Sequence, residues 1–123
     1  MRVLISCEFS GIVREAFKAK GHYALSCDLL PTEIPGNHYQ GDARDLLIPG
    51  QWDLMIAHPP CTYLAVSGAR WFKDEGREEK QEEALEFVRI LLNAPIEKIC
   101  IENPVSIIST RIKKPSQYIL FAI

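Results

Sequence analysis

The sequence predicts one α/β domain over residues 1–123, built on a mostly parallel sheet. Short apolar runs that fit buried strands alternate with segments of helical periodicity. These runs are apolar throughout, as expected when helices cover both faces of a parallel sheet. A chain of 123 residues is long enough for one core and leaves no room for two domains.

The first half of the chain is predicted to contain three strands and one clear helix. Residues 2–7 and 22–28 form apolar runs typical of strands, and residues 38–40 form a short third strand or a turn. A helix begins near Ser10 or Gly11 and ends before Gly21, which suits a C-terminal cap. Its apolar residues recur at helical spacing: Val13, Ala16 and Phe17.

The second half is predicted to contain two more strands around a long helix. Residues 52–57 and 98–103 are apolar enough for buried strands. An amphipathic helix over about 77–94 points five residues inward: Ala84, Phe87, Val88, Leu91 and Leu92. Residues 104–123 give no clear pattern.

Composition and charge indicate a soluble protein. No apolar run approaches the roughly 20 residues that a membrane span needs, so we expect no membrane contact and a cytoplasmic location, in a bacterium or a phage-infected cell. The formal net charge of −2 does not indicate a large positively charged surface of the kind that binds nucleic acid. The four cysteines have no zinc-like spacing, and three of them (Cys7, Cys27 and Cys100) fit small buried residues. Cys61 differs because it follows its strand, in a loop.

Chemically distinctive residues follow each predicted strand. They are the segment 8–11 after the first strand, Asp28 at the end of the second, Asp42 after the third, the segment 58–61 after the fourth, and the segment 102–104 after the fifth. The carboxyl ends of parallel strands share one edge, and ligands bind there in open α/β sheets. The sequence therefore predicts a binding site at this edge.

The same residues resemble a known family. The series Phe9-Ser10-Gly11, Asp28, Gly41-Asp42, Pro60-Cys61 and Glu102-Asn103 is similar, in order and placement, to the motifs of S-adenosylmethionine-dependent DNA cytosine (carbon-5) methyltransferases, closest to short phage-encoded members. The resemblance spans residues 2–117. It implies the three-layer, Rossmann-like class I methyltransferase fold, with S-adenosylmethionine as cofactor and DNA as partner.

The resemblance also implies residue roles. Phe9, Ser10 and Gly11 would approach the methionine part of the cofactor, Asp28 would bind the ribose hydroxyls, and Asp42 would face the adenine. Pro59 would join these cofactor contacts. Cys61 would attack carbon 6 of a flipped cytosine, and Glu102 would hold nitrogen 3 and the exocyclic amine. Four further residues would contact the substrate: His58, Pro60, Arg70 and Asn103.

Two features depart from the family pattern. Val13 and Arg14 stand where similar enzymes have further glycines, and His58 precedes the two prolines. The residues after Pro104 are too few for two more strands and a target-recognition region, so the sheet is expected to lack its last strands. A second copy of the chain or a partner chain would cover the apolar tail over residues 118–123.

Two other functions remain open. One is a methyltransferase-fold protein of impaired activity that acts as a nucleic-acid or protein binding module. The other is transfer of a larger one-carbon unit to a pyrimidine through a similar cysteine.

Overall fold

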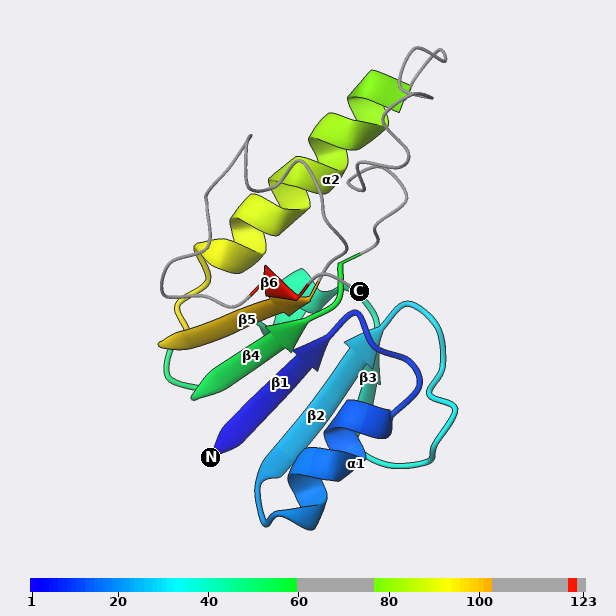
Figure 1. Ribbon diagram of the computed structural model, residues 1–123, viewed down its shortest axis with the longest axis vertical. Helices are drawn as coiled ribbons and strands as arrows, with labels where there is room; N and C mark the ends of the chain where they lie inside the picture. Colours follow the sequence, from blue (N-terminus) through cyan, green and yellow to red (C-terminus); the bar gives the residue numbers. More distant parts are fainter. Residues whose placement is uncertain (60–76, 103–119, 122–123) are drawn as a thin grey trace.

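A parallel sheet of six strands forms the centre of the molecule (Figure 1). The computed structural model describes residues 1–59, 77–102 and 120–121. The strands are β1 (Arg2–Ser6), β2 (Tyr23–Asp28), β3 (His38–Gln40), β4 (Leu54–Ala57), β5 (Lys98–Glu102) and β6 (Leu120–Phe121). They lie in the order β3-β2-β1-β4-β5-β6, and every neighbouring pair is parallel. The predicted α/β class with a parallel sheet is confirmed, and the order is compatible with a Rossmann-like fold.

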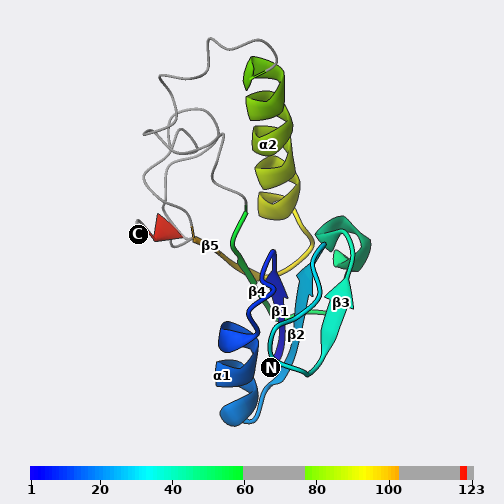
Figure 2. The same cartoon turned by 90° about the vertical axis from the view of Figure 1, so that its right-hand side faces the viewer.

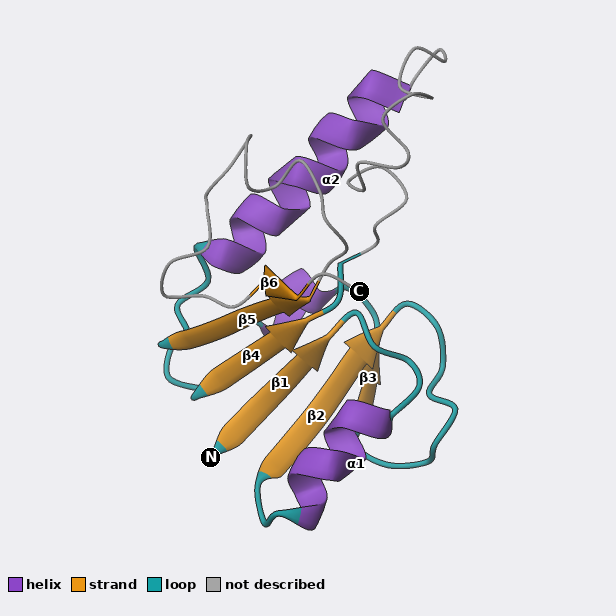
Figure 3. Ribbon diagram, viewed as in Figure 1, coloured by secondary structure: helices purple, strands orange, loops and turns teal. Residues whose placement is uncertain are grey.

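Helices cover both faces of this sheet (Figures 2 and 3). Helix α1 (Ile12–Ala19) packs Val13 and Phe17 on one face, against a cluster of Val3, Ile5 and Ala24. Helix α2 (Arg77–Leu92) packs on the opposite face, and its buried apolar residues Leu85, Val88 and Leu91 meet a cluster that includes Leu4, Met55 and Ile99. Successive β1 residues point to opposite faces, so an all-apolar strand can serve both clusters.

The predicted elements agree with the observed ones to within two residues at the strand ends, and the differences have physical causes. In α1, Ala16 is exposed, and the face turned to the sheet carries the buried Arg14 instead. In α2, Leu85 is fully buried, whereas Ala84, Phe87 and Leu92 are half-buried at the margin of the core. A single-turn 3-10 helix, η1 (Ala43–Leu46), replaces the weak helix expected after β3.

The expectation that the sheet stops at its fifth strand is corrected. Leu120 and Phe121 form β6 and pair in parallel with Ile101 and Glu102 of β5. Sequence patterning missed this strand because two residues carry no detectable periodicity. Among the helices that the structure describes, none is long and apolar enough to cross a membrane.

Candidate functional site

The carboxyl edge of the sheet brings together the described residues that the sequence singled out. Glu8 follows β1, Asp28 ends β2, Asp42 follows β3, His58 follows β4 and Glu102 ends β5. Parallel pairing puts these strand ends side by side. Four of the predicted site residues lie outside the described residues: Pro60, Cys61, Arg70 and Asn103.

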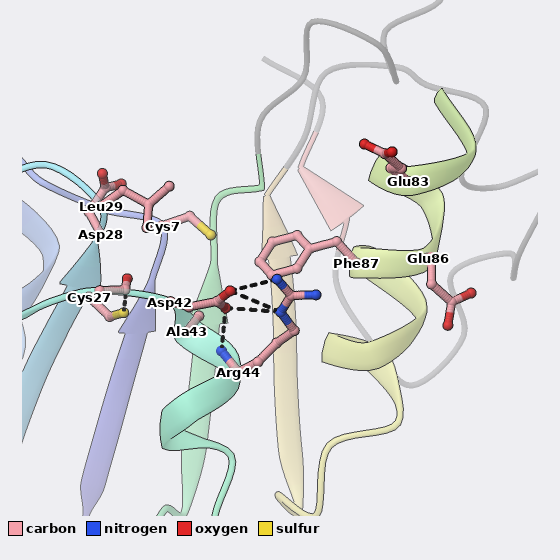
Figure 4. A pocket seen from close by; sticks show the side chains of 11 residues that line it. Cys7, Cys27, Asp28, Leu29, Asp42, Ala43, Arg44, Glu83, Glu86 and Phe87 are labelled. Carbon is pink, nitrogen blue, oxygen red and sulfur yellow. Dashed lines mark hydrogen bonds and ion pairs between the residues drawn. The ribbon is translucent and has the colours of Figure 1, made fainter. Parts of the chain in front are cut away.

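A large cavity of about 580 Å³ opens between this edge and α2 (Figure 4). Four acidic residues contribute to its lining, two from the strand ends and two from α2: Asp28, Asp42, Glu83 and Glu86. The Phe87 ring projects from α2 towards Asp42 and Arg44 in the loop after β3, and Glu83 lies further along the helix. The guanidinium of Arg44 lies 5.8 Å from the centre of the Phe87 ring and so connects the two walls. We call this space the large cavity.

The two aspartates of the large cavity differ in how their carboxylates are bound. Asp28 accepts the backbone N–H of Leu30 at Oδ1, at 2.8 Å, which is a common turn geometry. Its Oδ2 accepts from none of the residues that the structure describes. Asp42 is paired with Arg44 through both oxygens, at 2.6 Å for the shortest contact, and caps η1. The hydrogen bond from the Arg44 side chain lowers the pKa of Asp42.

The three described cysteines are free thiols. Burial raises the pKa of Cys7 from 9.0 to about 12, and neighbouring Cys27 and Asp28 add to the shift. Burial likewise raises the pKa of Cys27 to about 12, and that of Cys100 is raised mainly by burial. A thiol of this kind is a poor nucleophile at neutral pH because almost none of it is thiolate. Cys7 and Cys27 are therefore wall residues of the large cavity.

The protein's own side chains occupy the N-terminus of α1. Oε1 of Glu8 accepts the N–H of Val13 at 3.0 Å and the hydroxyl of Ser10 at 3.2 Å. Oγ of Ser10 in turn accepts the N–H of Ile12 at 3.2 Å. Dinucleotide-binding folds place a pyrophosphate at the corresponding helix N-terminus. Here a carboxylate takes the position of the anion.

His58 lies between two carboxylates of this edge, that of Glu8 after β1 and that of Glu102 at the end of β5. Its Nδ1 lies 2.5 Å from Oε2 of Glu102, and its Nε2 lies 3.8 Å from Oε2 of Glu8. Sequence reasoning assigned His58 to the substrate but missed its contacts with two carboxylates. A smaller cavity of about 310 Å³ adjoins this group and is lined in part by Glu8, Ser10 and His58. We call this space the small cavity.

The remaining cofactor-side residues fall on the small cavity or behind it. Phe9 and Ser10 line the small cavity, and Phe9 is exposed. Gly11 has a left-handed backbone with φ 86°, and a Cβ there would lie 2.8 Å from the Arg14 guanidinium. Its missing side chain thus leaves room for Arg14. Pro59 is buried.

Arg14 is a structural residue that sequence reasoning did not identify. Its side chain is fully buried and donates to Ser26, Thr32 and the carbonyl of Ile34 at 2.6–3.1 Å. A Cβ at Gly36 would lie 2.7 Å from the guanidinium. Arg14 therefore ties α1 to the 29–37 loop, whose first residue lines the large cavity. The glycines of that loop and of the α1 turn were the available signal.

The comparisons with known proteins add no assignment. No protein-family model, no curated protein and no solved structure matches the chain.

Proposed function

We propose that this protein is an S-adenosylmethionine-dependent methyltransferase that transfers a methyl group to carbon 5 of cytosine in DNA, with Cys61 as nucleophile. The observation that carries the proposal is the charge distribution at the carboxyl edge. Asp28 ends β2 in a 580 Å³ cavity that four acidic residues and Arg44 help to line, and Glu8 fills the anion position at α1. Of the acidic residues, Glu86 turns its carboxylate away from Asp42 and Arg44 and pairs it with Arg89. The order β3-β2-β1-β4-β5-β6 supports the finer fold assignment, the three-layer class I methyltransferase fold.

The charges favour a cationic nucleoside over a nucleotide. S-adenosylmethionine carries a sulfonium group, an ammonium group and one carboxylate, so it is a net cation, and it has no phosphate. Because Asp42 is paired with Arg44 and Glu86 with Arg89, the carboxylates of Asp28 and Glu83 are the ones that attract its positive groups and repel the phosphates of a dinucleotide. The helix N-terminus that would otherwise hold a phosphate has already used its first donors on Ser10 and Glu8.

The residues of the large cavity suit the adenosine part of such a ligand. Oδ2 of Asp28 faces no donor among the described residues, so it can accept from ribose hydroxyls while Oδ1 keeps its turn contact with Leu30. Arg44 holds the Asp42 carboxylate in place at the adenine side. The Phe87 ring supplies an apolar wall from α2.

The chemistry of transfer rests on residues of the β4 and β5 ends. S-adenosylmethionine supplies an electrophilic methyl group. In the proposed reaction, the Cys61 thiolate adds to carbon 6 of cytosine and makes carbon 5 nucleophilic towards that group. Carbon 5 takes the methyl group and S-adenosylhomocysteine leaves. Loss of the carbon-5 proton to a water molecule then breaks the bond between carbon 6 and the sulfur of Cys61 and returns the thiolate. Glu102 holds nitrogen 3, which carries a proton in the adduct, and the exocyclic amine, and both groups donate to its carboxylate. His58 orients that carboxylate through Nδ1.

Two measurements test the proposal. Calorimetric titration should show S-adenosylmethionine binding at least about tenfold more tightly than ATP, because the acidic cavity disfavours phosphate. DNA that contains 5-fluorocytosine should form a covalent adduct that maps to Cys61, because fluorine at carbon 5 cannot leave as a proton does. Cys61→Ser is the matched control and should form no adduct. Binding of DNA without cofactor binding or adduct would instead favour a non-catalytic binding module.

A further inference from the structure

The small cavity lies at the switch point of the sheet, between the ends of β1 and β4. Chain connections run in opposite directions from this point, because β2 follows on one side of β1 and β5 follows on the other side of β4. Ligands bind preferentially at such a point in α/β sheets. The cavity has a volume of about 310 Å³, which is large enough for a small polar group and its stem.

Glu8, which helps to line this cavity, has an unsatisfied acceptor. Its side chain is only 6% exposed, and Oε1 is satisfied by Ser10 and Val13. Oε2 is buried and has no hydrogen-bond partner among the described residues. A buried carboxylate oxygen without a donor is costly, so its retention points to a donor that a ligand supplies.

His58 presents a second unsatisfied atom beside it. A carboxylate at neutral pH accepts and does not donate, so the contact with Glu102 places a proton on Nδ1 of His58. This leaves Nε2 as an acceptor in the neutral ring. Nε2 is also buried and has no hydrogen-bond partner within the described ranges. It lies 3.8 Å from Oε2 of Glu8, which is too far for a direct hydrogen bond.

We propose that Glu8 and His58 form a subsite for one amino group, either an ammonium or an exocyclic amine. A single nitrogen placed between two acceptors 3.8 Å apart can lie within hydrogen-bond distance of both, about 2.8–3.0 Å from each. Such a nitrogen must carry at least two hydrogens, which an amino group has. An anion is disfavoured by the carboxylate. The described side chains form no group of three that could hold a metal ion.

Two sources of that amino group are consistent with the proposed function, on which this assignment rests. One is the amino-acid end of the cofactor, and the other is the 4-amino group of the target cytosine, in which case Glu102 would hold nitrogen 3 alone. Matched ligands separate them. The pair S-adenosylhomocysteine and S-(3-carboxypropyl)thioadenosine differs only in the amino group of the amino-acid end. Oligonucleotides with cytosine or 2-pyrimidinone at one position differ only in the 4-amino group.

The variant that tests the subsite is Glu8→Gln. The carbonyl oxygen of glutamine can still accept from Val13, while its amide NH₂ replaces the Oε2 acceptor with a donor. In the parent protein we expect removal of the relevant amino group to weaken binding by about 10- to 100-fold, the range for a hydrogen bond to a charged group. In Glu8→Gln the two members of that pair should bind within about twofold of each other.

A measurement on the parent protein avoids dependence on the fold of the variant. The ¹⁵N signal of His58 Nε2 should shift when the amino-bearing ligand is added and stay in place with its deaminated partner. Equal binding of both members in both ligand pairs, with no shift of this signal, would overturn the subsite.

If S-adenosylhomocysteine and its deaminated partner bind equally well and tightly, the cofactor source fails although the proposed function stands. If neither binds, the proposed cofactor itself is wrong, and the two failures are thus distinguishable.

Discussion

Nδ1 of His58 lies 2.5 Å from Oε2 of Glu102, so the residue after β4 and the last residue of β5 are joined at the centre of the sheet edge. Both side chains are about three-quarters buried. A hydrogen bond between partly buried groups is less weakened by solvent than a surface contact. This contact fixes the orientation of the carboxylate that the proposed reaction needs for the base.

Glu102→Gln separates the charge of this residue from its contact with His58. The amide oxygen of glutamine can still accept from Nδ1, so the free energy of unfolding should change by less than about 1 kcal/mol. Methyl transfer should slow by about 100-fold or more, as expected when a group that assists proton or charge transfer is lost. Single-turnover transfer to DNA and denaturant unfolding measure the two effects. An unchanged transfer rate would remove Glu102 from the site.

Arg14→Met should destabilise the protein by about 3 kcal/mol, because the guanidinium is fully buried and its three partners, of which Ser26 is buried, lose their donors. Methionine retains the length of the stem and removes the charge. Lys18→Met on the same helix is the control, since Lys18 is exposed, and it should change stability by no more than about 0.5 kcal/mol. Urea unfolding compares the two variants. A similar loss of unfolding free energy in both variants would show that Arg14 is not needed to hold the 29–37 loop.

Arg14 shows where prediction from the sequence ends. Apolar runs revealed β1, β2, β4 and β5, because a parallel strand that is covered on both faces is apolar at nearly every position. Arginine is rarely buried, and the partners of Arg14 come from β2 and the loop after it, 12–20 positions away. The periodicity of the helix does not record such contacts, and their only trace in the sequence is the pair of glycines that leave room for the guanidinium, Gly11 and Gly36.

For the site, the sequence predicted which residues share one edge of the sheet, but it did not predict their individual contacts. The rule that parallel strand ends share one edge correctly grouped Asp28, Asp42, His58 and Glu102. It could not separate Asp28, which has a carboxylate oxygen available, from Asp42, which is held by Arg44. Rotamers and distances decide that difference, and they arise only in the packed structure.

Thiol chemistry distinguishes the proposed nucleophile from the wall cysteines. The pKa of Cys7 and Cys27 is about 12, so both should react slowly with iodoacetamide at pH 7.5. Cys61 should be labelled first if it is an activated nucleophile. Peptide mass spectrometry after brief labelling measures the order, and Cys61→Ser is the control. Faster labelling of Cys7 than of Cys61 would contradict the assignment.

The raised thiol pKa values also predict a loss of stability in alkali. The thiols stay protonated in the folded state up to about pH 12, whereas in the unfolded chain they ionise near 9.0. The unfolded state therefore binds fewer protons between these values, and stability falls as pH rises through that window. We expect the fall between pH 8 and pH 10.5 to be smaller in Cys7→Ala and Cys27→Ala than in the parent. Urea unfolding measures the free energy of unfolding at each pH. An equal fall with pH in the parent and in both variants would contradict the raised pKa values.

Asp28→Asn tests the ribose contact of the proposed cofactor. The amide oxygen can still serve the turn at Leu30, but asparagine loses the charge and replaces one acceptor with a donor. S-adenosylmethionine should bind about tenfold more weakly or worse, because the amide NH₂ then stands where Oδ2 accepted from the ribose hydroxyls. Asp53→Asn is the matched control, since Asp53 is an exposed aspartate that accepts from Arg2 at the opposite edge of the sheet. Calorimetry should show unchanged affinity for that control, so equal weakening by both variants would mean that the cofactor senses overall charge and that Asp28 makes no specific contact with it.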